Sequence, residues 1–352
     1  MISYVGGQDG CTTIRVVIPH ILLNQYNHKN IIFQAYYSNV FNVDIKFYND
    51  ASVIQFQRSA TDKQADICEL VKRKIKVLTR SFFSYEIDDD LFNIPQWNYA
   101  YEFYLPLKKH ITKIISLADG VTVSTPKLKE LYSQFNSNIV VIPNYLPRFI
   151  WGIPTCAAKD VKIPTIIYPC SSNHFSIKKD VPGGDLGNIL KDFIRKTTSI
   201  YNWVFIGGCT LEFDDLIKTG KIQRYGWVAI WNYPEFLRTL NADIGIAPLE
   251  LNDFNRCKSN IKSLEYTALG IPGVYTDIDP YGEMELKAKS EEEFISHIEK
   301  LSSSPDYRQN IWRKTYDSLK NDLYWEDNGY LNLRKYAQTY LDLMGKKDLR
   351  LV

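Results

Sequence analysis

The stretch 257–272, CKSNIKSLEYTALGIP, combines charged residues with a short predicted helix. Apolar residues recur through it at helical spacing and form one stripe, and Gly270, followed two residues later by proline, marks the helix end. Glu265 falls on the same stripe, which should face the core. Lys262 and Lys258 precede it by about one and two turns. A carboxylate that faces inward behind two ammonium groups fits either a binding site or an ion pair on the helix surface.

The expected position of this helix tells which ligand it could hold. It follows the predicted strand 243–249, so it should begin at the carboxyl edge of a parallel sheet, where ligands bind. The free N–H groups there favour an anion, and Lys258 and Lys262 could hold a diphosphate. Ser259 could cap the helix or donate to a phosphate, and Glu265 could accept both hydroxyls of a ribose. The alternative is that Lys262 and Glu265, three residues apart, form only a surface ion pair.

A second charged segment, YEIDDDLF at 85–92, crowds four acids into five positions: Glu86, Asp88, Asp89 and Asp90. Crowded carboxylates repel one another, so the run either has a use or lies in solvent. Three interpretations stay open. Asp88 and Asp90 could be oxygen ligands of a metal ion, the acids could contact an acceptor or serve as a general base, or they could only favour a helix N-terminus.

Two further segments end predicted strands with small or hydroxyl-bearing residues. PCSSNHFSIKKD at 169–180 carries Ser171, Ser172 and His174, which could donate to phosphate oxygens or form an ordinary polar turn. Gly207 could let a nucleotide base approach the backbone closely, or could simply end its strand.

Short β-branched segments alternate with helical patterns along the chain, which predicts parallel βαβ units. Strands are expected at 14–19, 43–48, 52–57, 121–124, 139–143, 164–170, 201–208, 222–226, 243–249 and 273–277. Helices are expected at 62–78, 105–119, 126–135, 184–198, 234–241, 259–269, 290–302, 305–322 and 329–344. We therefore expect an α/β protein with two Rossmann-like domains that face a central cleft.

The proline-rich stretch 143–164 has no long periodic segment and predicts a linker. Residues 1–150 would form an N-terminal acceptor domain and 151–325 a nucleotide-binding domain. Residues 326–352 would form a C-terminal helix that packs back on the N-terminal domain.

Composition sets broad limits. The 352 residues are 45% hydrophobic and 23% charged, with a net charge of +2, which excludes a histone-like electrostatic binder. The six cysteines are scattered and include no CxxC pair, which fits a reducing compartment. With no signal-like start and no apolar run of membrane-spanning length, the sequence predicts a cytoplasmic protein without a membrane span.

The segment 242–277 resembles the nucleotide-binding end of the GT-B-type retaining glycosyltransferases. In that family a helix with a glutamate, followed by a small residue, glycine and proline, holds the donor ribose, and Glu265, Gly270 and Pro272 match it. The family often has a second glutamate eight positions earlier, where this chain has Cys257.

A subgroup with the pattern FN-x-x-KS-x-x-K-x-x-EY gives a fuller match. Its positions correspond here to Phe254, Asn255, Lys258, Ser259, Lys262, Glu265 and Tyr266. The segments 118–146 and 81–95 also resemble the family's first domain and its acidic segment.

The resemblance implies a reaction and a set of roles. A sugar would pass from a nucleotide-sugar donor, a UDP-sugar in our expectation, to an acceptor hydroxyl with retention and without a required metal. Ser171, Ser172 and His174 would lie near the diphosphate and sugar. Arg15 would lie near the cleft, on the acceptor side with Glu86; the alternative for Arg15 is an exposed strand edge.

For the acceptor, the resemblance extends to enzymes of tailed phages and of surface-polysaccharide loci. Our first expectation is 5-hydroxymethylcytosine in double-stranded phage DNA, flipped out of the helix in the host cytoplasm. The basic stretches 71–80 and 107–113 and the aromatic run 97–104 could form its rim, or could be solvated helix faces and core. A polysaccharide or glycolipid acceptor, and a non-catalytic nucleotide- or DNA-binding protein, are the alternatives.

Overall fold

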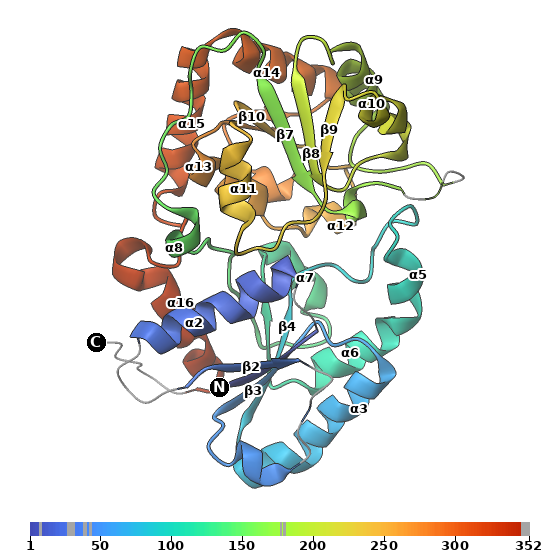
Figure 1. The fold of residues 1–352 in the computed structure, drawn as a ribbon. Coiled ribbons are helices and arrows are strands. Elements are labelled where there is room, and N and C mark those ends of the chain that lie inside the picture. The colour runs from blue at the N-terminus through green and yellow to red at the C-terminus, as the bar shows by residue number, and fades with distance from the viewer. Residues whose placement is uncertain are drawn as a thin grey trace.

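Two parallel β-sheets, one in each half of the chain, form the framework of the protein (Figure 1). The computed structural model describes residues 1–6, 9–26, 32–37, 41, 44–176, 178 and 181–345. The first sheet contains β1 (Ile2–Val5), β2 (Gln34–Tyr37), β3 (Val53–Gln57), β4 (Phe82–Ile87), β5 (Gly120–Val123) and β6 (Ile139–Val141). The second contains β7 (Thr165–Cys170), β8 (Asn202–Gly207), β9 (Ile222–Tyr225), β10 (Ile244–Ala247), β11 (Gly273–Thr276) and β12 (Lys287–Ala288).

The strand order in the described residues is β2-β1-β3-β4-β5-β6 in the first sheet and β12-β11-β10-β7-β8-β9 in the second. All the pairings within these sheets are parallel. In the first sheet, β2 and β3 lie on opposite sides of β1, and in the second, β8 and β10 lie on opposite sides of β7. This change of direction beside the first strand of each half is the arrangement of doubly wound folds. The predicted α/β class with two Rossmann-like domains is confirmed.

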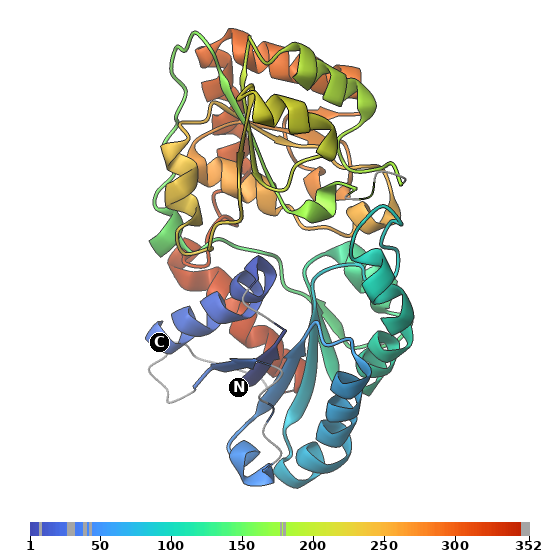
Figure 2. The same cartoon turned by 45° about the vertical axis from the view of Figure 1, so that its right-hand side comes forward.

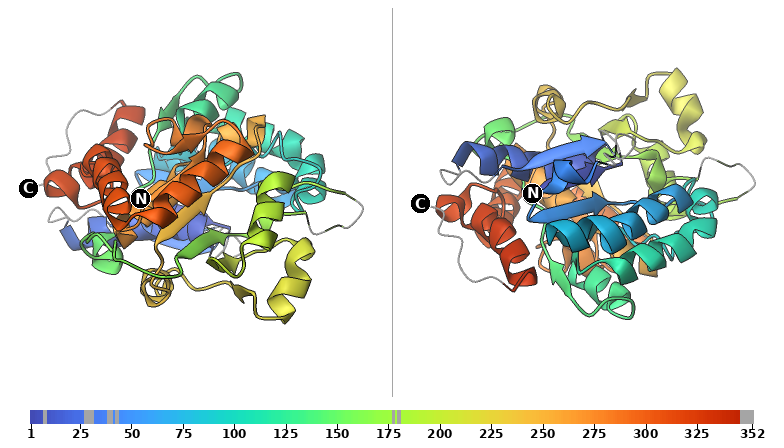
Figure 3. Two further views of the ribbon diagram at one scale, coloured as in Figure 1. Left: turned by 90° about the horizontal axis from the view of Figure 1, so that it is seen from above. Right: turned by 90° about the horizontal axis from the view of Figure 1, so that it is seen from below.

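Helices cover both faces of both sheets (Figures 1 and 3). Those of the first half are α1 (Gly10–Thr12), η1 (Thr13–Val17), α2 (Ile18–Tyr26), η3 (Ile45–Tyr48), α3 (Asp62–Leu70), η4 (Val71–Ile75), α4 (Lys76–Thr79), α5 (Tyr101–Tyr104), η5 (Leu105–Leu107), α6 (Lys108–Leu117) and α7 (Pro126–Tyr132). Those that follow are α8 (Arg148–Trp151), η6 (Ser172–His174), α9 (Asn188–Lys196), η7 (Leu211–Phe213), α10 (Asp214–Lys218), α11 (Tyr233–Thr239), α12 (Asp253–Arg256), α13 (Ile261–Leu269), η8 (Asp279–Tyr281), α14 (Glu291–Ser303), α15 (Pro305–Leu319) and α16 (Asp327–Leu343).

The start of the chain differs from the prediction. The strand is β1, and the segment 14–19, predicted as a strand, is helical in η1 and α2. Asp9 begins this helix by accepting a hydrogen bond from the Thr12 N–H at 2.6 Å. Apart from Arg15 the segment 14–19 is apolar, and Ile18 packs in the cluster shared by the first sheet and α16. A short, mainly apolar segment fits a buried helix as well as a buried strand.

The first half departs from the prediction at three other elements. The predicted strand 43–48 is wrong where it is described, because residues 45–48 form the 3₁₀ helix η3, and residue 43 lies outside the described residues. Strands β2 and β4 were not predicted. Strand β2 is a largely exposed edge strand without an apolar pattern. Strand β4 lies at the start of the acidic segment 81–95, where we considered the carboxylates and not the strand pattern. The other predicted strands and helices occur within a few residues of their expected bounds.

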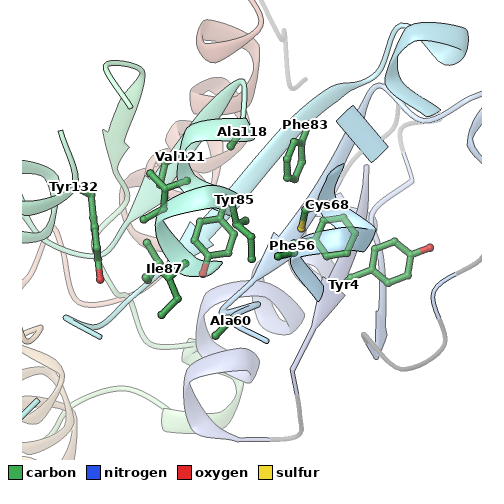
Figure 4. Close-up of a cluster of buried hydrophobic side chains, with 14 of the residues drawn as sticks. Tyr4, Phe56, Ala60, Cys68, Phe83, Tyr85, Ile87, Ala118, Val121 and Tyr132 are labelled. Atoms are coloured by element: carbon green, nitrogen blue, oxygen red, sulfur yellow. The ribbon is translucent and has the colours of Figure 1, made fainter. Parts of the chain in front are cut away.

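The two faces of the first sheet differ in chemistry. One face is apolar and packs against α3 and α6, with Tyr4, Phe56 and Tyr85 at its centre (Figure 4). The other face buries polar side chains beneath α2 and α16, among them Gln55 and Glu86. Because side chains alternate along a strand, the residues of β4 that pack the core also fix the direction of its polar residues.

The chain crosses between the domains twice, and the two crossings are bonded together. The N–H of Leu146 donates to the Leu323 carbonyl at 2.9 Å, and the Trp325 N–H donates to the Leu146 carbonyl at 3.0 Å. Helix α16 then returns to the N-terminal half, where it lies beside α2 (Figures 1 and 2). Helix α16 is therefore part of the first domain's core rather than an appendage, and residues 346–352 of the predicted C-terminal segment lie outside the described residues.

His20 supplies a stability prediction on this packed face. Its ring is buried between Phe33 and Tyr336, and neither ring nitrogen has a hydrogen-bond partner among the described residues. Burial, with the Met1 ammonium second, lowers the pKa of His20 to about 3. The unfolded chain therefore binds the proton more tightly, and the stability due to His20 is complete above its unfolded pKa near 6.5 and falls as the pH drops toward 3.

Replacing His20 by phenylalanine should make the free energy of unfolding fall less steeply as the pH drops from 6 to 3. For the wild type we expect His20 to contribute a loss of about 1.4 kcal/mol per pH unit between pH 6 and pH 3. Urea unfolding of both proteins at a series of pH values measures it, and their difference in slope is the contribution of His20. Identical slopes below pH 6 would contradict the buried, neutral histidine.

Candidate functional site

The segment 257–272 lies at the carboxyl edge of the second sheet, as predicted. It follows β10 and α12 and contains the loop 257–260 and α13. Asn260, not Ser259, is the N-cap residue of α13, and the Ser263 N–H donates to the Asn260 carbonyl at 2.9 Å. Gly270 ends the helix with a left-handed φ of +82°, the conformation expected of a glycine after a helix.

Within α13, Lys262 and Glu265 form an ion pair that is largely enclosed. Their side chains are 17% and 7% exposed, and Nζ lies 2.8 Å from Oε2. Tyr233, at the start of α11, adds its hydroxyl to the group: burial raises the pKa of Tyr233, and the charge of Glu265 and a hydrogen bond to it raise it further. The pair is therefore not the solvated surface ion pair that the sequence left as an alternative. Tyr233 was not predicted, because it lies outside the motif.

Lys258 and Ser259 point toward the other domain. The Lys258 ammonium lies 4.3 Å from the centre of the Phe254 ring and 3.8 Å from Asp89 Oδ1. The Ser259 hydroxyl oxygen accepts a hydrogen bond from Asn144 Nδ2 at 2.9 Å. Two of the residues predicted to hold a diphosphate thus lie where the two domains meet.

The loop after β7 lies close to these lysines. His174 Nδ1 is 2.6 Å from Asp185 Oδ2. Burial lowers the pKa of His174, Asp185 opposes the shift, and the positive charges of Lys258 and Lys262 lower it further. The loop that carries His174 therefore lies near enough to Lys258 and Lys262 to feel their charge.

Asp185 organises this loop and was missed by the sequence analysis. It is buried, and its Oδ1 accepts from the Glu250 N–H at 2.9 Å and from Asn255 Nδ2 at 2.6 Å. It therefore ties the loop that carries His174 to the segment that leads into α12. A single aspartate after two glycines gives no sequence signal of such a role.

The other residues predicted on the donor side are less constrained. Ser171 and Ser172 are exposed at the carboxyl end of β7. Gly207 has a φ of +88°, and a Cβ there would lie 2.4 Å from the Cys170 carbonyl oxygen. The approach of β8 to β7 thus already accounts for this glycine, and its contact with a nucleotide base stays a prediction.

The acidic run separates into different environments. Asp88 and Asp89 lie at the carboxyl end of β4 and share one guanidinium: Arg58 Nε is 2.8 Å from Asp88 Oδ1, and Arg58 Nη2 is 3.0 Å from Asp89 Oδ2. Arg58 has a left-handed φ of +51°, an uncommon conformation for a side chain of this size. It was not predicted as a site residue.

Asp90 is engaged by its own turn instead. It is fully buried and accepts hydrogen bonds from the Phe92 and Asn93 N–H groups and from Asn93 Nδ2. Its carboxylate thus caps this turn, while Asp88 faces Arg58. Among the described residues there is no group of three or more His, Cys, Asp or Glu side chains placed to hold a metal ion.

Arg15 and Glu86 form a buried pair, with Arg15 Nε 2.7 Å from Glu86 Oε1. Arg15 is on a helix rather than at a strand edge, so the alternative interpretation of this residue is wrong. Burial raises the pKa of Glu86 to about 7, although Arg15 acts in the opposite direction. Arg15 Nη1 also donates to Asn144 Oδ1 at 3.0 Å, and Asn144 in turn holds Ser259. The predicted acceptor-side pair is therefore linked to the donor-side loop.

The basic stretch 71–80 lies away from this site. Lys72 and Lys76 both bind the Asp119 carboxylate, which precedes β5, at 2.7 Å and 2.6 Å. Lys76 also lines a groove of about 490 Å³ whose walls come from residues just before β3, β4 and β5. The stretch is thus at the amino edge of the first sheet, opposite to the acids, and does not form the rim that was considered for a polyanion.

The aromatic run 97–104 does reach the domain boundary. Trp97 Nε1 donates to Glu250 Oε2 at 2.9 Å, and Asn98 Nδ2 donates to the Asn173 carbonyl at 3.0 Å. Tyr99 and Phe103 are exposed beside them.

No described helix has the length and apolar character needed to cross a membrane.

The comparisons with known proteins give remote structural similarity. No protein-family model matches the chain, and no curated protein matches it. A protein of Listeria monocytogenes described as a UDP-N-acetylglucosamine 2-epimerase aligns over 100% of this chain and 99% of its own at 10% identity, with a TM-score of 0.48. A form of Os79 from O. sativa in complex with UDP aligns over 97% and 100% at 10% identity, with a TM-score of 0.47.

The wall teichoic acid polymerase TagF aligns over 98% of this chain and 89% of its own at 12% identity, with a TM-score of 0.44. Similarity this remote does not carry the activities of these proteins to the present chain. A functional assignment has to come from the arrangement of its own side chains at the domain boundary.

Proposed function

We propose that the protein is a glycosyltransferase that moves a sugar from a nucleotide-sugar donor, a UDP-sugar in the first instance, to an acceptor hydroxyl. One observation carries the proposal: Lys258, in the loop that leads to Lys262 and Glu265 on α13, lies 3.8 Å from Asp89 of the opposite domain, and Asp89 shares Arg58 with Asp88. This contact supports a site in which cations hold a diphosphate, Glu265 holds a ribose and the aspartates meet an acceptor hydroxyl.

The chemistry follows from this separation of charge. As the bond between the sugar and the diphosphate breaks, its electron pair stays on the phosphate oxygen, and Lys258 and Lys262 stabilise the growing negative charge. The sugar becomes oxocarbenium-like while the acceptor oxygen bonds to it and passes its proton to the carboxylate of Asp88 or Asp89. Asp88 and Asp89 lie on the side from which an acceptor would approach, and the buried boundary would exclude water. Retention at the anomeric carbon remains the expectation from the family resemblance.

For the acceptor, we propose 5-hydroxymethylcytosine in DNA, chiefly on the family resemblance. The exposed Tyr99 and Phe103 at the boundary could stack on bases. The ion-paired lysines of 71–80 add no support, because they lie at the opposite edge of the sheet. A surface polysaccharide or glycolipid remains the alternative.

A screen tests the activity and the acceptor together. UDP-, GDP-, ADP-, CDP- and dTDP-sugars are offered with hydroxymethylated DNA, unmodified DNA and lipid-linked or polymeric saccharides, and the release of nucleoside diphosphate is measured. Release that requires hydroxymethylated DNA supports the DNA acceptor, and release only with saccharides supports the alternative. Nucleotide binding without release for any acceptor would indicate a binding protein.

A further inference from the structure

The loop 257–260, which we propose holds the diphosphate, also contacts the N-terminal domain. Three consecutive residues of this loop each bond to a different element of the first domain. These contacts are Thr125 Oγ1 to the Cys257 carbonyl at 2.9 Å, Asp89 Oδ1 to Lys258 Nζ at 3.8 Å, and Asn144 Nδ2 to Ser259 Oγ at 2.9 Å. A ligand that binds at this loop must therefore bind beside these contacts with the first domain or replace some of them.

Lys258 is the residue for which this competition is direct. Its ammonium has one described carboxylate within ion-pair distance, that of Asp89, and the face of Phe254 on another side. Its side chain is 18% exposed, so few other partners can reach it. Lys262 differs, because its carboxylate partner Glu265 lies on its own helix. Carboxylate and phosphate oxygens are alternative partners of an ammonium group, and a diphosphate carries more charge.

Asp89 can give up Lys258 without being left as an unpaired buried charge. Arg58 Nη2 stays 3.0 Å from its other carboxylate oxygen, Oδ2. Arg58 belongs to the first domain, like Asp89 itself, so this pair does not depend on how the two domains meet. The exchange thus removes one of two cations from Asp89 and leaves the other.

We propose that in the free protein the Asp89 carboxylate takes the place of the donor's phosphate beside Lys258, and that donor binding transfers Lys258 from Asp89 to the phosphate. This inference rests on the proposed function, since the incoming anion is the nucleoside diphosphate part of the donor. Asp89 then acts as an internal competitor of the donor. It also becomes more available to an acceptor hydroxyl once Lys258 has left, so the donor binds before the acceptor.

Titration calorimetry with UDP, and with GDP, ADP, CDP and dTDP, tests the exchange. Asp89→Asn should bind the preferred nucleoside diphosphate about three to ten times more tightly than the wild type, because it removes a partly enclosed competing ion pair. Lys258→Met should bind more weakly, and Asp89→Asn added to Lys258→Met should give no gain. Asp88→Asn is the matched control: it removes the same charge one residue away, but Asp88 pairs with Arg58 and not with Lys258.

The outcomes separate the exchange from the activity. Equal or weaker binding by Asp89→Asn overturns the exchange, and so does a gain that persists without Lys258 or that Asp88→Asn reproduces in full. A wild type that binds none of the five nucleoside diphosphates overturns the proposed function, and the exchange with it. Thermal unfolding confirms that each variant is folded, and Asp89→Ser repeats the test if the asparagine variant is not.

Discussion

Replacing Glu265 by alanine is expected to weaken the binding of UDP, or of whichever nucleoside diphosphate the protein prefers, by roughly 1–3 kcal/mol, about five- to 150-fold. The reason is the loss of charged hydrogen bonds to the two ribose hydroxyls. A second contribution comes from Lys262, which pairs with Glu265 at 2.8 Å and would lose the group that positions it. Titration calorimetry of the wild type and the variant gives the difference directly.

A ligand without the ribose hydroxyls separates these two contributions. The 2′,3′-dideoxy analogue of the nucleoside diphosphate cannot form the proposed bonds, so Glu265→Ala should cost much less binding free energy with it than with the normal ligand. Glu265→Gln, which keeps the side-chain shape and one acceptor oxygen, should fall between wild type and alanine. Equal losses with both ligands would remove the ribose role and leave Glu265 as the partner of Lys262.

Gly270→Ala is expected to destabilise the second domain by about 2–4 kcal/mol. The residue has a φ of +82°, and a Cβ there would lie 1.8 Å from the Thr155 carbonyl oxygen, a backbone atom that cannot rotate away. The Gly270 carbonyl also accepts the Ala157 N–H at 2.9 Å, so the linker and the helix end are fixed to each other. Urea unfolding followed by tryptophan fluorescence and circular dichroism measures the loss.

Two other glycines serve as matched controls for the two causes. Gly220 also has a left-handed φ, +71°, but nothing lies within 4 Å of the position of its Cβ. Gly220→Ala should therefore show the conformational cost alone, about 1–2 kcal/mol. Gly282 has a φ of −48° and its nearest contact is an ordinary 3.6 Å, so its alanine variant should be near neutral. If Gly270→Ala cost no more than Gly220→Ala, the close approach to Thr155 would not matter.

The two predictions concern the middle and the C-terminal end of one short helix. Glu265 uses α13 to bring a carboxylate beside Lys262, and Gly270 stops the helix so that the chain can enter β11. The linker that carries Thr155 is held against this end. The donor-side residues thus depend on the linker between the domains as well as on their own sheet.

Much of the second half could be predicted from the sequence, because its helices and strands have clear local patterns of apolar and helix-ending residues. Helix α13, its end at Gly270 and its position after β10 follow from apolar spacing, a stop signal and the order of elements. The first half was less predictable. The mainly apolar segment 14–19 forms a helix rather than the predicted strand, and β4 lies at the start of the acidic segment 81–95 and was not predicted.

The sequence by itself determined which residue types could bind a nucleotide and which helix carries them. Only the tertiary structure decided their partners: Asn144 meets Ser259 across 115 positions, Arg58 reaches Asp89, and Asp185 holds the loop of His174. The physical reason is the range of the interactions. Helices and strands are set mainly by neighbours a few residues apart, whereas these side-chain contacts depend on how whole elements, sheets and chain crossings pack together.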